Sequence, residues 1–340
     1  MKSDSKIYEM GGVITEADGE HCTVRLRMPA GIATADQVIA AAELAKKYGT
    51  NELHFTTRQT LEIPHIPADR LPSFYEDLVA TGNNVGAERG EIVNITACPG
   101  TERCKFANID AVGMAKKIDA KYFGKDMPGK VRIAISACPN ACTSETLNEI
   151  GITGICTPVR QPGYCTGCGT CVQYCQEDAL SVREGKIIMD DGSCVDCGTC
   201  VRSCIYGILE SKPVSYRITF GGRRGRHPKV GTHLITVNTE ESALQVIDLI
   251  VDWIYRYARF DRPIIQQIGS DLDMEEFKTH LRKKNPRGNN RSLKKVCGQD
   301  EGNRHTIAQT PTKTGTKTPT FSEQSPSPGK NSTGIITSFR

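Results

Sequence analysis

The pattern of apolar and polar positions predicts a small unit of strands and helices at the start of the chain. Residues 22–28 (CTVRLRM) alternate apolar and polar side chains, as a half-buried strand does. Thr34 and Gln37 have the spacing of a capping box. They predict a helix over residues 35–48 that ends at Gly49.

Strand and helix patterns alternate again farther along the chain. Residues 52–63 have strand character, and a second helix is expected over residues 68–80. This order favours an α+β fold. Strand-like segments then lead into Cys98 and into Cys138, and a helix is expected to begin near Cys104.

The second half of the chain adds three predicted features. Residues 143–155 predict a helix followed by a strand, and residues 214–221 predict another strand. Residues 240–259 predict a long helix whose apolar stripe faces the core. The stripe consists of Leu244, Ile247, Ile250, Trp253 or Ile254, and Tyr257.

Length and cysteine content bound the class of protein. The 340 residues allow two ordinary domains, or one large domain with an insertion. There is no run of 18 apolar residues, and the first residues are polar without a signal stretch, so we expect a cytoplasmic protein and no membrane association. Fifteen cysteines in such a chain favour metal or redox chemistry over disulfides.

The net charge of +4 comes from one end of the chain. Residues 283–340 carry 11 Lys and Arg against 3 Asp and Glu, so the preceding residues have an acidic excess. The folded body therefore has no basic signature of nucleic-acid binding. The segment after residue 283, rich in Thr, Ser, Pro, Gly and Asn, is predicted to be a disordered basic tail.

Residues 157–213 contain a duplicated cysteine run. The spacing C-x2-C-x2-C-x3-C occurs twice and is that of bacterial ferredoxins with two [4Fe–4S] clusters, in which the fourth cysteine crosses to the other cluster. A pair of zinc knuckles is the alternative. The fourth cysteine is expected to begin a helix. The predicted ligand sets are Cys165, Cys168, Cys171 and Cys204 for one cluster, and Cys194, Cys197, Cys200 and Cys175 for the other.

Four more cysteines form two pairs. Cys98 and Cys104 have five residues between them, and Cys138 and Cys142 have three. Together they can supply four thiolates to a third cubane, with zinc or buried free thiols as the alternative. Cys22, Cys156 and Cys297 fit no ligand set and are expected to be ordinary thiols.

The C-x5-C pair, the C-P-N-x-C segment and the following EIGITG resemble the sirohaem-dependent nitrite and sulfite reductases. Three further segments are similar to that family and occur in its order: TTRQTLEIPHI (56–66), PGKVRIAIS (128–136) and FGGRRGRHPKVG (220–231). The resemblance covers residues 10–270. The inserted ferredoxin module makes the layout most similar to the catalytic sirohaem subunit of anaerobic sulfite reductases.

The resemblance implies a domain plan. Residues 1–85 would be a ferredoxin-like half-domain, and residues 86–156 and 214–282 the two parts of a sirohaem and [4Fe–4S] domain. Residues 157–213 would be the inserted ferredoxin domain. Larger family members contain two copies of this half-repeat, so a complete pocket is expected to need a homo-oligomer or another subunit.

The resemblance also implies cofactors and site residues. It implies sirohaem and three [4Fe–4S] clusters, one of them coupled to sirohaem through the Cys142 thiolate. Arg58, Lys130 and Arg132 would form the catalytic cationic pocket, since Arg forks two donors onto an oxyanion and Lys can also deliver a proton. The expected macrocycle contacts are Gln59, Asn140, Arg223, Arg224, Arg226 and Lys229.

These features predict an enzyme that reduces sulfite to sulfide with six electrons. No dinucleotide-binding glycine motif follows a strand, so electrons are expected from a donor subunit or a soluble ferredoxin, entering through the inserted module. Nitrite reduction to ammonia on the same scaffold is the nearest alternative. A non-haem electron-transfer subunit and an iron–sulfur regulator that uses the tail on nucleic acid are the others.

Overall fold

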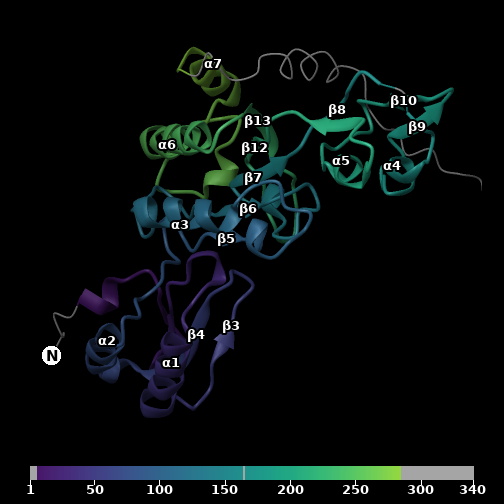
Figure 1. Cartoon of the computed structure of the whole chain (residues 1–340). Helices are drawn as coiled ribbons and strands as arrows, with labels where there is room; N and C mark the ends of the chain where they lie inside the picture. The colour runs from purple at the N-terminus through teal and green to yellow at the C-terminus, as the bar shows by residue number, and fades with distance from the viewer. Residues whose placement is uncertain (1–5, 164, 285–340) are drawn as a thin grey trace, which may run out of the picture. The chain divides into compact units, whose positions relative to one another are not determined.

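The computed structural model describes residues 6–163 and 165–284. Residues 285–340 of the predicted tail, including Cys297, lie outside these residues, whereas Lys283 and Lys284, also assigned to the tail, end a helix. None of the helices in this part of the chain is long and apolar enough to span a membrane. The chain is mixed α and β, as the sequence predicts (Figure 1).

The first unit is a four-stranded sheet with two helices. Its strands run in the order β1-β2-β4-β3, and α1 packs against β4 and α2. The unit has its own hydrophobic cluster, in which Val24, Leu44, Ile63 and Phe74 are buried. The strands are β1 (Val13–Thr15), β2 (His21–Arg25), β3 (His54–Phe55) and β4 (Leu61–Pro67), and the helices are α1 (Ala35–Tyr48) and α2 (Leu71–Ala80).

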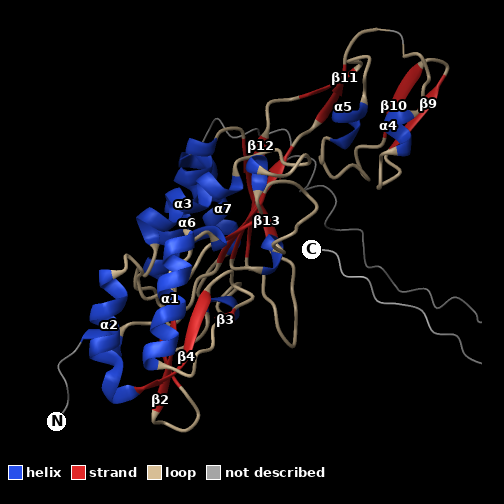
Figure 2. Cartoon of the chain, turned by 60° about the horizontal axis from the view of Figure 1, so that its bottom comes forward, coloured by secondary structure: helices blue, strands red, loops and turns tan. Residues whose placement is uncertain are grey.

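The second unit is a five-stranded mixed sheet in the order β13-β12-β7-β6-β5. Strands β5, β6 and β7 are parallel, and the remaining pairs are antiparallel. Helices α3 and α6 pack on this sheet, and α7 packs on α6 (Figure 2). The strands are β5 (Thr96–Ala97), β6 (Ile133–Ser136), β7 (Ile150–Ile155), β12 (Ser215–Phe220) and β13 (Thr232–Val237); the helices are α3 (Ala111–Tyr122), α6 (Glu240–Tyr257) and α7 (Met274–Lys284).

A small cysteine-rich module is inserted between β7 and β12. Two antiparallel strand pairs and two short helices surround a cluster of buried residues that contains Cys171, Leu180, Cys200 and Leu209. Its strands pair as β8 with β11 and as β9 with β10. The elements are β8 (Pro158–Arg160), α4 (Thr170–Gln173), β9 (Leu180–Arg183), β10 (Lys186–Met189), α5 (Thr199–Ser203) and β11 (Leu209–Ser211).

Several local predictions are confirmed. The Thr34 side chain accepts a hydrogen bond from the Gln37 backbone, the Gln37 side chain caps in return, and α1 ends before Gly49. Strands β5 and β6 lead directly into the two cysteine pairs. Helix α6 buries the predicted Ile247, Ile250, Trp253 and Ile254.

Other local predictions are wrong, for identifiable reasons. Residues 52–63 form two strands because Gln59 takes a left-handed conformation (φ 57°) and turns the chain between them. The helix expected near Cys104 begins at Ala111, where the Asp110 side chain caps the Gly113 N–H at 2.8 Å. Only a 3-10 turn, Glu145–Leu147, precedes β7.

Two further corrections concern exposure and the cysteine helices. Tyr257 is 60% exposed because it lies in the last turn of α6, beyond the sheet-facing stripe. The short helices α4 and α5 hold the third cysteine of each run, not the fourth. They begin after Gly169 and Gly198, which take φ of 75° and 72°.

An ion pair joins the first sheet unit to α3. The Arg27 Nε lies 2.9 Å from Asp119 Oδ2, and the Asp119 side chain is almost fully buried. Burial raises the pKa of Asp119, and Arg27 opposes that shift. The pair therefore keeps a buried carboxylate ionised between the two units.

We predict that Arg27→Ala destabilises the protein by about 3 kcal/mol at neutral pH, because it leaves that carboxylate buried without its partner. Without Arg27 the folded-state pKa of Asp119 rises further above its unfolded value. The loss is therefore present above that pKa and shrinks as the pH falls through it and Asp119 takes up a proton. Urea unfolding at several pH values measures this, with Lys116→Ala, an exposed change on the same helix, as control. Equal stability of the two variants would contradict the prediction.

Candidate functional site

The parallel strands β5 and β6 bring the two cysteine pairs together. Cys98 follows β5, Cys138 follows β6, and the Ala137 N–H donates to Cys98 Sγ at 3.1 Å. Burial raises the pKa of Cys138, and the charges of Cys98, Cys104 and Cys142 raise it further against a backbone hydrogen bond. Cys98 and Cys138 are buried, Cys104 is half-buried and Cys142 is exposed. These four thiols are therefore neighbours that reach from the core to the surface.

The two runs of the module also face each other. The Cys171 thiol is electrostatically coupled to Cys204, Cys165 and Cys168, and the Cys194 thiol to Cys197 and Cys175. Burial, followed by Cys197 and Cys194, raises the pKa of Cys200 to about 12. Each group thus combines three cysteines of one run with the fourth of the other, which is the crossed grouping expected from the spacing.

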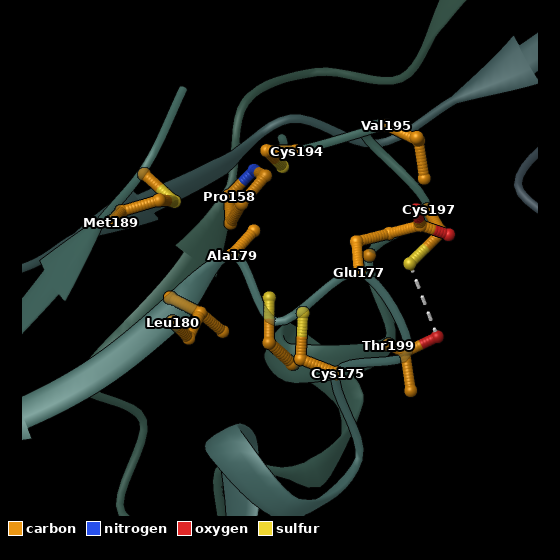
Figure 3. Close-up of a pocket in the computed structure, with 12 residues that line it drawn as sticks. Pro158, Cys175, Glu177, Ala179, Leu180, Met189, Cys194, Val195, Cys197 and Thr199 are labelled. Atoms are coloured by element: carbon orange, nitrogen blue, oxygen red, sulfur yellow. Dashed lines mark hydrogen bonds between the residues drawn. The ribbon is translucent and has the colours of Figure 1, made fainter. Parts of the chain in front are cut away.

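The second of these groups lines a cavity. Cys175, Cys194, Cys197 and Cys200 lie around an apolar space of about 350 Å³, part of it open to solvent (Figure 3). Leu180 and Met189 contribute to its walls. A thiolate set inside an apolar wall suits an iron–sulfur cluster, whose potential depends on burial and hydrogen bonds to sulfur.

No group of three or more His, Cys, Asp or Glu side chains within residues 6–163 and 165–284 is arranged to hold a single metal ion. A [4Fe–4S] cluster makes a different demand, because each of its four cysteines binds a different iron. Its ligands surround a volume instead of converging on a point. The three cysteine groups fit this donor set.

A second, polar cavity of about 420 Å³, partly open to solvent, lies where the first sheet unit meets the cysteine loops. Cys142 lines it. Its other walls come from the β3–β4 loop, from β5 and from the turn after β12. The lining residues are Thr57, Arg58, Gln59, Thr96, Cys142, Thr143, Ser144 and Arg224.

Arg58 is fixed in this cavity by the second unit. Its guanidinium donates to Asn148 Oδ1 at 2.9 Å and to the Asn94 carbonyl at 2.7 Å, while Nε is buried without a partner. Thr96 Oγ1 is also buried without a partner. Burial, then the charges of other arginines, led by Arg132, lowers the pKa of Arg58 to about 10, so it is charged at neutral pH. Unpaired buried donors in a cationic cavity suit a small oxyanion.

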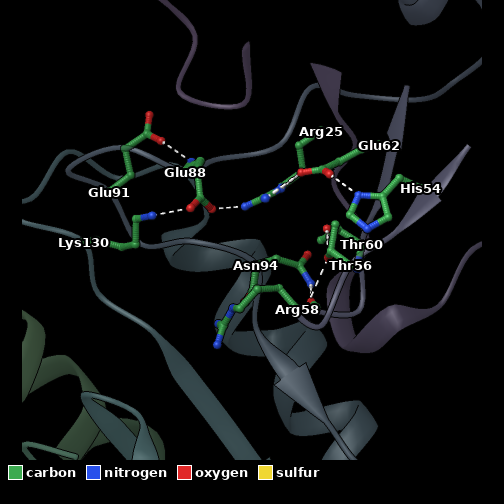
Figure 4. Close-up of polar contacts among 10 residues, drawn as sticks. All are labelled: Arg25, His54, Thr56, Arg58, Thr60, Glu62, Glu88, Glu91, Asn94 and Lys130. Atoms are coloured by element: carbon green, nitrogen blue, oxygen red, sulfur yellow. Dashed lines mark hydrogen bonds and ion pairs between the residues drawn. The ribbon is translucent and has the colours of Figure 1, made fainter. Parts of the chain in front are cut away.

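Lys130 and Arg132 lie near this cavity but do not line it. Lys130 forms an ion pair with Glu88, which also pairs with Arg25 (Figure 4). Arg132 lies 3.3 Å from Glu149. The charge of Arg132 lowers the pKa of Arg58, and the charge of Arg58 contributes to lowering the pKa of Lys130. The structure therefore places them outside the lining of the cavity, within electrostatic reach of Arg58.

The other predicted site residues fall into two groups. Gln59 lines the cavity, but its amide is held by the Ala97 backbone, with both hydrogen bonds 2.9 Å long. Arg224 lines the cavity and donates to the Thr143 carbonyl at 2.6 Å. Arg223 keeps a buried Nε without a partner but lies outside the lining. Exposed positions outside the lining are occupied by Asn140, Arg226 and Lys229.

Sequence reasoning missed three charged residues of the site. Glu88 forms ion pairs with both Arg25 and Lys130, and Arg25 also pairs with Glu62. Glu149 forms an ion pair with Arg132. Arg25 gave no signal, because a charged residue is ordinary on the polar face of a half-buried strand. Glu149 had one, because it begins the EIGITG segment that resembles the family, whereas Glu88 lies in a segment whose pattern marks no site.

Comparison with known proteins gives the family. Residues 14–81 match the nitrite/sulfite reductase ferredoxin-like half domain, and residues 88–287 match the nitrite and sulphite reductase 4Fe-4S domain. The second match alone spans more than half of the chain. The chain belongs to the nitrite and sulphite reductase family. The resemblance read from the sequence motifs is confirmed, and the protein is an oxidoreductase of this family.

Two relatives are similar to this chain in sequence, and one solved structure shares its fold. An uncharacterized protein of Methanocaldococcus jannaschii is 33% identical over 272 residues, covering 80% of this chain and 94% of that protein. One subunit of the anaerobic sulfite reductase of Salmonella typhimurium is 30% identical over 243 residues, covering 66% and 72%. The structure of dissimilatory sulfite reductase I shares the fold, with a TM-score of 0.61 at 16% identity over 76% of this chain and 69% of that one.

We predict that Arg58→Met weakens sulfite binding by about tenfold to hundredfold, because a charge-assisted hydrogen bond to an anion contributes about 1.5–3 kcal/mol. Isothermal titration of the anaerobically purified protein measures the affinity. The exposed Arg89→Met is the matched control, and melting temperatures of both variants show whether Asn94 and Asn148 still hold the loop. Unchanged affinity in folded Arg58→Met would remove Arg58 from the anion site.

Proposed function

We propose that this protein reduces sulfite to sulfide with six electrons, using sirohaem and a [4Fe–4S] cluster that share the Cys142 thiolate. One observation carries the proposal. Cys142 neighbours Cys138 in the cysteine group between β5 and β6, and it also lines the cationic cavity. A thiolate in that position would serve as a ligand of a cluster held by the cysteine group, and it faces the anion cavity.

The anion cavity supplies binding and protons. Arg58 and Arg224 line it and are the groups that would bind the oxyanion, with Lys130 and Arg132 adding positive potential from outside its lining. Each oxygen of sulfite leaves as water, so the site must also supply protons. Lys130 is the candidate proton donor, because its ammonium loses a proton far more readily than a guanidinium. Since Lys130 does not line the cavity, it would deliver the proton through intervening water.

The residues around the cavity fit an anionic tetrapyrrole. When bound, sirohaem supplies the iron that binds the substrate and delivers electrons to it. Its carboxylates need basic partners. The basic turn after β12 offers them, and the unpaired Nε of Arg223 needs an acceptor. The residues that would hold sirohaem are Cys142, Gln59, Asn140, Arg223, Arg224, Arg226 and Lys229.

The module is the proposed electron relay. Two [4Fe–4S] clusters in it would receive electrons singly from a donor subunit or a soluble ferredoxin. A further cluster at Cys98, Cys104, Cys138 and Cys142 would bring the number of [4Fe–4S] clusters in the chain to three. We favour sulfite over nitrite because of this inserted module and because a relative belongs to an anaerobic sulfite reductase.

Steady-state assays with each anion test the substrate. With reduced viologen as donor, we expect a higher kcat/KM for sulfite than for nitrite, and one sulfide formed per six electrons consumed. Cys142→Ala should abolish turnover, while Cys22→Ala, which changes a buried thiol outside the cysteine groups, should keep it. A higher kcat/KM for nitrite would make nitrite the preferred substrate. A protein with iron–sulfur absorption but without the Soret and red-region bands of sirohaem would leave only an electron relay.

We predict that Glu88→Gln moves the alkaline limb of the kcat/KM profile to lower pH. Burial, followed by the charges of Arg132, Arg25 and Arg58, already lowers the pKa of Lys130. Removal of the Glu88 carboxylate takes away a partner of the charged form, so Lys130 loses its proton at lower pH still. Lys130→Arg should instead remove the limb. A limb at the wild-type position in Glu88→Gln would exclude Lys130 as the proton donor.

A further inference from the structure

The two copies in the cysteine module are alike in sequence but differ in how they contact the rest of the chain. CTGCGTCVQYC (165–175) aligns with CVDCGTCVRSC (194–204) position by position. Three aligned pairs differ in their contacts: Gly167 and Asp196, Gly169 and Gly198, and Gln173 and Arg202. In each pair the residue of the second copy contacts a residue outside the module.

Asp196 ties the second copy to the sheet. Its carbonyl accepts a hydrogen bond from the Cys156 N–H at 2.8 Å, and its carboxylate lies 3.0 Å from the Arg217 guanidinium on β12. Its counterpart Gly167 is exposed and has no side chain to make such a contact.

Gly198 shows how closely the second copy approaches Cys156, the residue that follows β7. A Cβ at Gly198 would lie 2.5 Å from Cys156 Sγ, whereas a Cβ at Gly169 would meet no atom within 4 Å. Both glycines take the same left-handed conformation, so the difference lies in the surroundings of the two loops. The loop that holds Cys197 is therefore packed on the core.

Arg202 connects this loop to the loops of the third cysteine group. Its guanidinium donates to the Cys197 carbonyl at 2.8 Å and to Asn108 Oδ1 at 3.0 Å. The Asn108 N–H then donates to the Ala137 carbonyl at 2.8 Å, and the Ala137 N–H donates to Cys98 Sγ at 3.1 Å. A route of hydrogen bonds and short backbone links thus runs from Cys197 of the second run to Cys98 of the third cysteine group.

The first copy has the opposite character. Cys168 is exposed, whereas its counterpart Cys197 is half-buried. Gln173 and its counterpart Arg202 are both exposed, so they differ in side chain and not in burial. Ile205 and Tyr206, which follow the crossed ligand Cys204, are 81% and 54% exposed.

We propose that electrons leave the module from the cluster of Cys194, Cys197, Cys200 and Cys175, and that Arg202 is the positioning residue for this transfer. The proposal rests on the proposed function. Each transfer oxidises that cluster by one electron and reduces the cluster at Cys98, Cys104, Cys138 and Cys142 by one electron. Arg202 keeps its charge and no proton moves. The other cluster of the module takes the electron from the donor.

Arg202→Gln, which gives the second copy the residue of the first, tests this assignment. The full chain is purified anaerobically with its clusters and sirohaem, and is mixed rapidly with a reduced bacterial 2[4Fe–4S] ferredoxin, without sulfite. Donor oxidation reports electrons reaching the module, and the sirohaem absorption change reports electrons arriving at the far end. We expect donor oxidation to keep its initial rate and the sirohaem change to slow at least tenfold.

Arg202→Lys should restore part of the rate, because an ammonium keeps the charge and one of the two hydrogen bonds. Arg183→Gln, a change of an exposed arginine on β9, is the matched control and should match the wild type. Asp196→Gly, which loosens the same loop without touching Arg202, should also slow the sirohaem change and serves if Arg202→Gln fails to fold. Equal rates of the sirohaem absorption change in the wild type, Arg202→Gln and Asp196→Gly would overturn this assignment and leave the proposed function untouched. A wild-type protein without sirohaem absorption would overturn the proposed function and this assignment with it.

Discussion

The site depends on a short turn that carries one thiol from the core to an open cavity. Cys138 is buried at the end of β6, and four residues later Cys142 is exposed. The chain makes this change by placing Ala141 and Ser144 in the left-handed region, at φ of 51° and 49°. The Thr143 and Ser136 hydroxyls lie 2.8 Å apart and hold the turn to the strand. Such strain persists only where the surrounding structure fixes the conformation, as it does here.

The cation cluster near this turn is assembled from three separate parts of the chain. Arg58 comes from the first sheet unit, Arg132 directly precedes β6 and Arg224 lies in the turn after β12. The charges of Arg132 and Arg224 add to burial in lowering the pKa of Arg58. Glu88 and Glu149 offset part of this charge from outside the cavity lining. A net positive field at a small cavity, beside a sulfur ligand, is what binding and reducing an oxyanion require.

Local signals in the sequence predicted much of this arrangement. Helix α1 and its cap follow from Thr34 and Gln37, and the crossed grouping of the module cysteines follows from their spacing. The position of Lys130 outside the cavity lining could not be predicted, because it depends on Glu88, a residue with no pattern of its own. The late start of α3 follows from the Asp110 cap, which the apolar periodicity does not show. The different contacts of the two module copies depend on Cys156 and Asn108, which lie outside the module.

The asymmetry of the module gives a direction to a duplicated structure. Two copies with the same cysteine spacing could pass electrons either way, but it is the second copy that packs against the core through Asp196, Gly198 and Arg202. Under the proposed direction of transfer, small differences outside the ligand positions, and not the ligands themselves, would determine which cluster takes electrons from the donor and which passes them to the third cysteine group.

The most direct test of the account is a crystal structure of the anaerobically purified protein, with iron located from its anomalous signal. We predict four irons surrounded by Cys98, Cys104, Cys138 and Cys142, and a fifth on the cavity side within bonding distance of Cys142 Sγ. A single metal ion held by those cysteines, or a cavity without iron beside Cys142, would contradict it.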